Sequence, residues 1–330
     1  MALKILGQAC GRGAGILGML LLAGVSMPSF SQGFPNRSVT LIYPFTAGSV
    51  ADVAFRRMAL EASKFLGQQV IYENRPGGNG RVGLNVMMNA RGDGYTLCIA
   101  NLGMLVLEPL ADPSLKVEPI KDYVPVVQVL ETFLVLAAHP SVPYRDMKGL
   151  VAFASANPGR VTAGVTGGSV GPLALELLRL SSGANITPVR YKGDANAVQD
   201  ALAGRVDLLI GVAGALRANR EQGKLVGIAA LGSRRVKLVP DVPTAQEQGF
   251  PVSAPNWSGI VAPAGTPQEA LSKLSVAFRD ALAAAEVRER MESIGVEVAT
   301  LQPEQFLAMI VSERDRLSNL VKQSGIKLTD

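Results

Sequence analysis

Hydrophobic and polar positions along the first half of the chain fall into two alternating patterns. Short runs rich in β-branched residues at 39–43, 69–72 and 95–100 predict strands. Between them, apolar residues recur at helical spacing, first up to Gly67 and then, after a turn-dense loop at 74–80, up to residue 90. Strand, helix, strand, helix, strand is the order typical of a parallel, doubly wound sheet.

The same plan returns about 120 residues later. Strands are predicted at 160–165, 187–191 and 206–210, with helices at 172–180 and 194–202. Each half therefore carries a strand, a loop of small residues and a helix start. Two such lobes facing each other would form a cleft between two helix N-termini.

The C-terminal part of the chain reads as helical. Apolar residues at helical spacing, from Leu271 to Leu282, predict a helix that ends near Gly295. Pro303 then stands where a first-turn proline belongs, and the apolar spacing continues to Gly325.

Residues 1–31 predict a signal peptide. Lys4 and Arg12 form a basic start, an apolar run follows at 14–25, and Pro28 ends that run before the small residue Ser31. About twelve apolar residues are too few for a membrane-spanning helix, which needs roughly 20. We expect cleavage near Ser31/Gln32 and a periplasmic protein.

Composition removes several classes of function. The 32 Lys and Arg residues against 27 Asp and Glu residues are spread along the chain, and aromatic residues make up only 5%. Both facts argue against a nucleic-acid partner. Two Cys and one His cannot build a zinc site with the usual nitrogen and sulfur ligands. We predict no metal and no organic cofactor, and we expect Cys98 to be a small buried hydrophobe.

The segment Gly167-Gly-Ser169-Val-Gly171 matches the G-x-S-x-G pattern of serine hydrolases, between a predicted strand and a predicted helix. A hydrolase needs a histidine to take the serine proton, and the only histidine is His139, in a turn beside Pro140. An exported hydrolase using Ser169 is therefore one hypothesis. In the other, Ser169 caps a helix and the glycines let the backbone approach a ligand closely.

Ser49-Val-Ala-Asp52 fits a capping box, in which Ser49 accepts from a first-turn N–H group and Asp52 reaches back. One interpretation is that this motif only starts a helix. The other is an anion seat, because the free N–H groups of a helix start favour a carboxylate or a phosphate. No G-x-x-x-x-G-K-[ST] motif is present, which disfavours phosphate.

Several motifs in the right order give the chain from residue 34 to about residue 327 a clear resemblance. They are Pro35-x-Arg37-x-Val-Thr-Leu-Ile-x-Pro44-Phe45, Gly48 with Asp52, Glu73-Asn-Arg-Pro-Gly77 with Gly80, Asp93-Gly-Tyr-Thr-Leu97, Tyr191-Lys-Gly193, Gly204-x-Val-Asp207, Pro240-Asp-Val-Pro-Thr244, and Trp257-x-Gly259 with Ala262-Pro-Ala-Gly-Thr-Pro267. With these motifs the chain resembles the Bug-type periplasmic solute-binding receptors of tripartite tricarboxylate transporters.

The resemblance implies an α/β fold of the two-lobed, type II-like periplasmic binding protein class, with two doubly wound sheets joined by two hinge crossings. Lobe 1 would comprise residues 32–133 and 257–330, and lobe 2 residues 134–256. The crossings would lie near residues 130–136 and 254–260. The C-terminal helices would then return to the first lobe.

The resemblance also implies a function. The protein would be a receptor, not an enzyme, and would hold a small mono-, di- or tricarboxylate or an acidic amino acid between its lobes. The ligand-binding residues carried over from the family are Phe45, Thr46, Ala47, Gly48, Ser49, Asp52, Thr166, Gly167, Gly168 and Ser169. The receptor would act as a monomer that delivers its ligand to one large and one small membrane subunit. A ligand-sensing partner of a signalling receptor is the alternative within the same fold.

Three positions depart from the family pattern. Ser49 stands where a second glycine is usual, Ala51 where a hydroxyl residue is usual, and Pro172 near a common histidine. These departures bear on which ligand is chosen.

Overall fold

The structure is a computed structural model that describes residues 33–48, 50–112, 114–115, 117–166, 170–191, 193–293 and 295–324. The chain divides into two units, Met1–Gly33 and Phe34–Asp330. The predicted signal peptide and its cleavage point at Ser31/Gln32 lie outside the described residues. Within the described part of the chain, no helix is both long and apolar enough to cross a membrane.

The first three predicted strands form a parallel group in the order β2-β1-β3. Strand β1 (Val39–Tyr43) leads to helix α1 (Val50–Leu66), and β2 (Val70–Asn74) leads to α2 (Arg81–Met88), before the chain enters β3 (Thr96–Asn101). Each of these elements was predicted within a few residues of its observed bounds. The carboxyl ends of all three strands therefore lie at one edge of the sheet.

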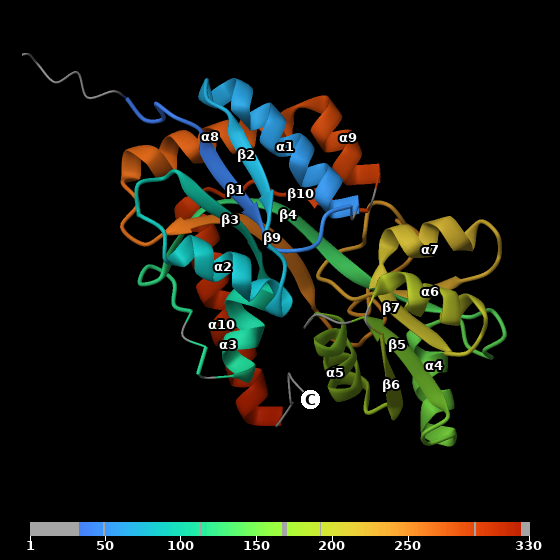
Figure 1. Cartoon of the computed structure of the whole chain (residues 1–330). Coiled ribbons are helices and arrows are strands. Elements are labelled where there is room, and N and C mark those ends of the chain that lie inside the picture. The colour runs from blue at the N-terminus through green and yellow to red at the C-terminus, as the bar shows by residue number, and fades with distance from the viewer. Residues whose placement is uncertain are drawn as a thin grey trace, which may run out of the picture. The chain divides into compact units, whose positions relative to one another are not determined.

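Both faces of the inner strands β1 and β3 are buried, as their lack of polar alternation requires. Leu41 and Ile99 pack with one apolar cluster, and their neighbours Ile42 and Cys98 pack with another. Figure 1 shows the helices on the two sides of the strands. The C-terminal helices are α8 (Gln268–Ala283), α9 (Ala285–Ser293) and α10 (Pro303–Ser324). The first cluster includes residues of α1, α8 and α9, whereas the second includes residues of α2 and α10.

The longest strand connects two groups of strands. Strand β4 (Tyr123–Ala138) pairs through Phe133 with β9 (Pro255–Pro263), which also pairs with β3. The short β10 (Glu297–Val298) pairs with the same part of β4. From Leu134 onward β4 pairs instead with β7 (Leu208–Val212) and β8 (Val226–Ala230). This exchange of partners falls within the first predicted crossing.

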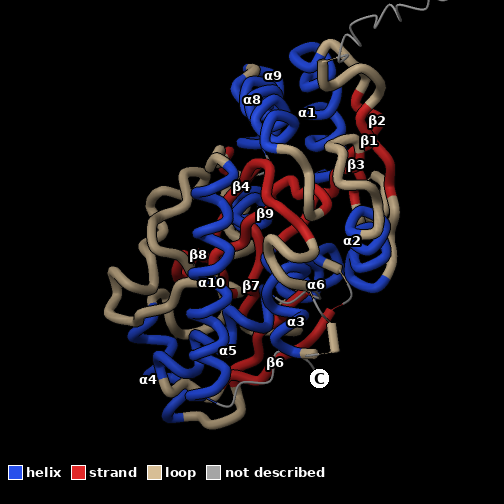
Figure 2. Tube along the Cα trace, turned by 90° about the vertical axis from the view of Figure 1, so that its left-hand side faces the viewer, coloured by secondary structure: helices blue, strands red, loops and turns tan. Residues whose placement is uncertain are grey.

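The second predicted half also forms as a parallel group. Strand β5 (Val161–Thr166) pairs in parallel with β6 (Ile186–Tyr191) and with β7. The helices of this half are α4 (Met147–Ala156), α5 (Val170–Ser182), α6 (Asp194–Leu202) and α7 (Ala213–Arg220). Figure 2 shows the strands as an inner layer with helices around them. The carboxyl ends of β5, β6 and β7 share one edge, as those of the first half do.

The result is the mixed α/β architecture that was predicted, with one addition. Because β4 belongs to both groups, one hydrogen-bonded path joins them in the order β2-β1-β3-β9-β4-β7-β5-β6, and β8 and β10 each pair with β4 beside that path. The helix predicted to end near Gly295 is divided at Ala284, whose extended ψ of 131° separates α8 from α9. Cys98 is fully buried, as expected of a small hydrophobe.

Candidate ligand-binding site at the carboxyl ends of the strands

The first predicted binding loop leaves the carboxyl end of β1 beside the ends of β2 and β3. Phe45 is half-buried, and its ring meets Tyr43 edge-on at a centroid distance of 5.5 Å. Thr46, Ala47 and Gly48 are exposed, and Ser49 lies outside the described residues. The half-buried Phe45 ring therefore anchors a loop whose next three residues face solvent.

Gly48 has a conformation that suits glycine. Its φ is +90°, in the left-handed region that other residues rarely adopt. A Cβ built on Gly48 would meet no atom within 4 Å, so the space beside the loop is open. Glycine at this position thus allows the left-handed turn, and it leaves room for a ligand to approach the loop backbone.

Asp52 holds this loop in place from the first turn of α1. Its side chain is only 3% exposed, and its Oδ2 atom accepts a 3.0 Å hydrogen bond from the Gly48 N–H. Its Oδ1 atom accepts a 2.8 Å hydrogen bond from the Asn74 amide, which also reaches the Phe45 carbonyl at 3.3 Å. Both oxygens of the carboxylate are therefore committed to the loop and to the end of β2.

A basic side chain completes this network. The Arg56 guanidinium donates a 2.8 Å hydrogen bond to Asn74 Oδ1 and lies 3.6 Å from Asp52 Oδ1. The same guanidinium covers the Tyr72 ring, 4.5 Å from its centroid. Burial alone raises the pKa of Asp52, but the hydrogen bonds from Asn74 and the Gly48 N–H, with the charge of Arg56, hold that pKa below its ordinary value. Asp52 is thus ionised and fully paired at neutral pH.

The capping-box prediction at Ser49 stays a prediction, because Ser49 lies outside the described residues. In a capping box the acidic side chain bonds the N–H of the capping residue, which here is Ser49. Among the described residues, Asp52 bonds the N–H of Gly48, where the backbone takes a left-handed turn. The Gly48 N–H is consequently occupied, and Gly48 offers open space to a ligand and no free donor.

The second predicted loop follows the carboxyl end of β5. The backbone of Thr166 closes that strand and pairs with Tyr191 at the end of β6. The Tyr191 hydroxyl donates a 2.8 Å hydrogen bond to Asp200 on α6. Gly167, Gly168 and Ser169 lie outside the described residues, and α5 begins at the next position, Val170. The ligand-binding role of this loop stays a prediction.

The position of His139 argues against the hydrolase hypothesis. The His139 N–H bonds the Asp207 carbonyl, just before β7 begins, and the Asp207 carboxylate bonds the Thr162 N–H near the start of β5. His139 therefore lies at the amino-terminal edge of β5 and β7, whereas the chain reaches Ser169 only after leaving the opposite edge. Moreover, the His139 Nδ1 atom already pairs with Ser141 Oγ at 2.7 Å.

Two residues of the site were missed by the sequence reasoning. The hydrogen bonds of Asn74 and Arg56 help to hold the loop in place, although neither residue belongs to the loop. A signal for Asn74 was present, because it ends the second predicted strand and parallel strands bring their carboxyl ends together. Arg56 was indicated only weakly, by its position one helical turn after Asp52.

The geometry can be compared with known proteins. A family profile described as "Tripartite tricarboxylate transporter family receptor" (TctC) matches residues 54–326 of this chain. This chain belongs to that receptor family. The match spans most of both strand groups, and the protein is therefore a binding receptor of a non-enzymatic family.

Solved structures of similar receptors show the same fold. A Rhodopseudomonas palustris protein solved with adipate is 29% identical, covers 89% of this chain and 99% of its own, and has a TM-score of 0.76. MatC from the same organism, solved with bound malate, is 29% identical over 87% of this chain and 100% of its own, with a TM-score of 0.72. The periplasmic binding protein BugD is 27% identical, covers 89% of this chain and 99% of its own, and has a TM-score of 0.71.

Proposed function

We propose that this receptor captures a small carboxylic acid and delivers it to a tripartite transporter. The observation that carries the proposal is that two relatives of the same fold, each 29% identical to this chain, were solved with adipate and with malate. Adipate and malate are both small dicarboxylates. The loop after β1 keeps Gly48 and Asp52 of the family pattern, although Ser49 and Ala51 depart from it. A ligand screen has to identify which carboxylic acid this receptor binds.

The loop after β1 supplies a means of binding an anion without a cationic side chain. No Lys or Arg lies within residues 45–52. The first N–H groups of α1 have no partner within the helix and carry partial positive charge, which favours a carboxylate beside them. Asp52 does not compete for the ligand's place, because its charge is matched by Arg56 and its oxygens are turned into the loop. Its role is to position the loop.

In this proposal residues 32–133 and 257–330 form one lobe and residues 134–256 the other, with the second donor set in residues 166–169. A ligand that touches both lobes favours a closed arrangement by its higher affinity for that arrangement. The exchange of β4 partners between Phe133 and Leu134 supports a hinge there, because the strand is paired to different neighbours on its two sides.

Carboxylate binding is testable by thermal shift. A ligand at about 100 times its dissociation constant should stabilise the fold by roughly 2.7 kcal/mol. At about 2–4 °C per kcal/mol this is a rise in melting temperature of several degrees. We expect the rise with small mono-, di- or tricarboxylates and not with their amides. A rise with neutral sugars and none with carboxylates would contradict the proposed ligand class.

A matched pair of variants tests the site. Ala47 is exposed in the loop, so Ala47→Phe leaves the fold intact but places a ring beside the donors, and we expect it to abolish the carboxylate shift. The exposed Ala218 on α7 takes the same change as a control and should bind normally. Gly48→Val is a poorer probe, because a β-branched residue at φ +90° strains the backbone whether or not a ligand binds. Normal binding by Ala47→Phe would place the ligand elsewhere.

Export is the second part of the proposal. The related protein BugD is a periplasmic binding protein, and the basic start and apolar run of residues 1–31 fit a cleaved leader. We expect the intact mass of protein released from the periplasm to begin at Gln32 or within a few residues. Retention of the full-length mass in membranes would overturn this part. The predicted partners, one large and one small membrane subunit, should be captured by the loaded monomer.

A further inference from the structure

A pocket of about 290 Å³ lies between α2 and the helices that follow β3. Its walls come from α2, from the π-helix Gly103–Leu107, from the short α3 (Glu108–Ala111) and from the segment after α3. None of its lining residues belongs to the loop after β1. At roughly 30 Å³ for each water it has room for about ten water-sized groups. It is thus a site of small-molecule size, separate from the loop residues proposed to bind the carboxylate.

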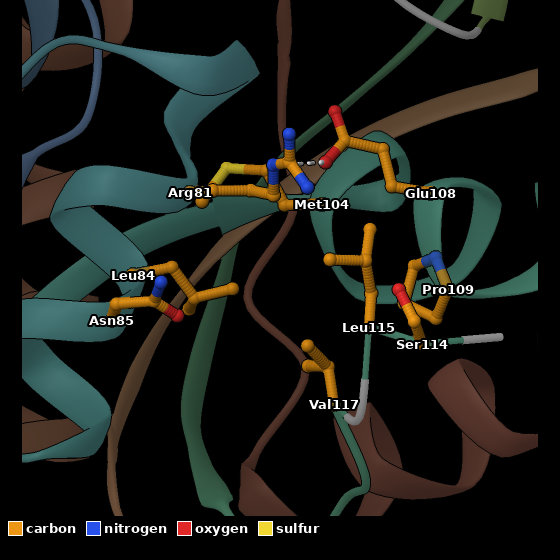
Figure 3. Close-up of a pocket in the computed structure, with 9 residues that line it drawn as sticks. All are labelled: Arg81, Leu84, Asn85, Met104, Glu108, Pro109, Ser114, Leu115 and Val117. Carbon is orange, nitrogen blue, oxygen red and sulfur yellow. Dashed lines mark ion pairs between the residues drawn. The ribbon is translucent and has the colours of Figure 1, made fainter. Parts of the chain in front are cut away.

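The lining of the pocket combines apolar side chains with one ion pair and the polar residues Asn85 and Ser114. Leu84 and Met104 form a buried floor, and Pro109, Leu115 and Val117 add apolar surface. Figure 3 shows Arg81 and Glu108 pointing toward each other above these residues. The Arg81 Nε atom is 3.9 Å from Glu108 Oε2, which is too long for a hydrogen bond. The single charged contact of this pocket is therefore loose.

One of the two oxygens of the Glu108 carboxylate has no hydrogen-bond donor among the described residues. This atom, Oε2, is shielded from solvent. Burial raises the pKa of Glu108, and Arg81 and the Asn79 amide oppose that rise only in part. Buried carboxylate oxygens in native structures nearly always have a hydrogen-bond partner. We therefore expect a bound molecule to donate a hydrogen bond to Glu108 Oε2. An ammonium group is the strongest donor that a small molecule can offer to it.

We propose that this pocket binds a small molecule that carries an ammonium group on an apolar body. The ammonium pairs with Glu108, and the body covers Leu84 and Met104. Arg81 is the group that must yield, and its side chain is long and 47% exposed. Arg81 therefore competes with the ligand for Glu108.

The test is calorimetric titration of the whole mature protein at pH 8 with phenethylamine, its neutral counterpart 2-phenylethanol and its anionic counterpart 3-phenylpropanoate. We expect phenethylamine to bind and to bind at least tenfold more tightly than the alcohol, as a charge-assisted hydrogen bond implies. Absence of phenethylamine binding at millimolar concentration overturns the proposal. Equal binding of amine and alcohol overturns the role of Glu108.

Two variants of the ion pair should act in opposite directions. Glu108→Gln keeps the shape of the side chain and should weaken phenethylamine binding at least tenfold. Arg81→Gln removes the competitor and should strengthen it severalfold. Glu118→Gln removes an acid from the exposed segment just beyond the pocket and should leave binding unchanged. A merely structural role for the pair would weaken binding in both variants, which would contradict the proposal.

A second pair of variants shows where the amine sits. Asn85 is exposed at the rim of the pocket, so Asn85→Trp should fill the opening and abolish amine binding. Val86, its exposed neighbour on α2, does not line the pocket, and Val86→Trp should bind normally. Ala47→Phe separates the two proposals, because it should remove carboxylate binding and leave amine binding intact. Loss of amine binding in Ala47→Phe, or its persistence in Asn85→Trp, places the amine outside this pocket.

Discussion

Asp52→Asn is expected to lower the melting temperature by roughly 6–12 °C at pH 7 and to weaken carboxylate binding at least tenfold. The wild-type carboxylate accepts hydrogen bonds from both the Gly48 N–H and the Asn74 amide. An asparagine can accept only one of these, and its NH₂ group then faces another donor. Hydrogen bonds to a charged group contribute about 1.5–3 kcal/mol each, and a broken buried network leaves its partners unpaired, so we expect a loss of about 3 kcal/mol. Thermal melts with and without ligand measure both effects.

The pH dependence of this difference has a definite sign. The folded-state pKa of Asp52 is lower than its ordinary value, so the ionised group stabilises the fold at every pH above the unfolded pKa. That stability is lost as the pH falls through the folded-state pKa. The wild type should therefore exceed Asp52→Asn by a constant margin near neutrality, and the margin should shrink below about pH 4.

Asp146→Asn provides the matched control. Asp146 caps α4 by accepting a 2.7 Å hydrogen bond from the Gly149 N–H, and asparagine caps a helix about as well. We expect this variant to melt within about 1 °C of the wild type, since the capping bond survives. Equal melting shifts for Asp52→Asn and Asp146→Asn would show that the buried network around Asp52 adds nothing beyond a helix cap.

Gly259→Ala is expected to destabilise the protein by about 3 kcal/mol or more, although it adds one methyl group. Gly259 lies in the middle of β9, between β3 and β4. A Cβ there would lie 2.2 Å from the Phe306 ring of α10 and 2.7 Å from the Val127 carbonyl oxygen. The ring is fully buried against Trp257, at a centroid distance of 5.5 Å, and the carbonyl is backbone, so neither yields easily. Urea denaturation midpoints measure the loss.

Gly211→Ala makes the same change in another paired strand, β7. The nearest atom to a Cβ at Gly211 would be a Leu209 side-chain carbon at 3.7 Å, an ordinary van der Waals contact. We expect this variant to lose less than about 1 kcal/mol, within the range of changes that disturb no packing. Similar urea midpoints for the two alanine variants would show that α10 moves aside, and that the tight packing of Phe306 on β9 is not a source of stability.

Local signals explain which elements were predicted well. Helix α6 was predicted at its observed bounds because Gly193 precedes it and Gly204, with a φ of +69°, follows it. The break at Ala284 carried no such signal, since neither glycine nor proline stands there and tertiary packing sets the turn. The exchange of β4 partners falls where a crossing was predicted, but the strand path through it depends on pairings with β7 and β9, which are distant in sequence.

The same contrast between local signals and contacts distant in sequence applies to the candidate site. The loop after β1 and Asp52 were identified by motif, because a turn of small residues followed by an acid is a local pattern. The hydrogen bond from the Gly48 N–H to Asp52 was not predicted, because it depends on the left-handed turn at Gly48. Asn74 joins the site only once β1 and β2 pair with Tyr43 opposite Asn74, a register that no local pattern fixes.

The late position of β9 in the chain sets an order of assembly. This strand fills the place between β3 and β4, yet it is synthesised only after the 116 residues that separate Ala138 from Pro255. At about 5–20 residues per second a ribosome needs roughly 6–23 s to cover that stretch. During this interval β3 and β4 each lack a neighbour, so the N-terminal portion has open strand edges and no finished core. A newly made chain thus stays accessible to chaperones until its last third has emerged.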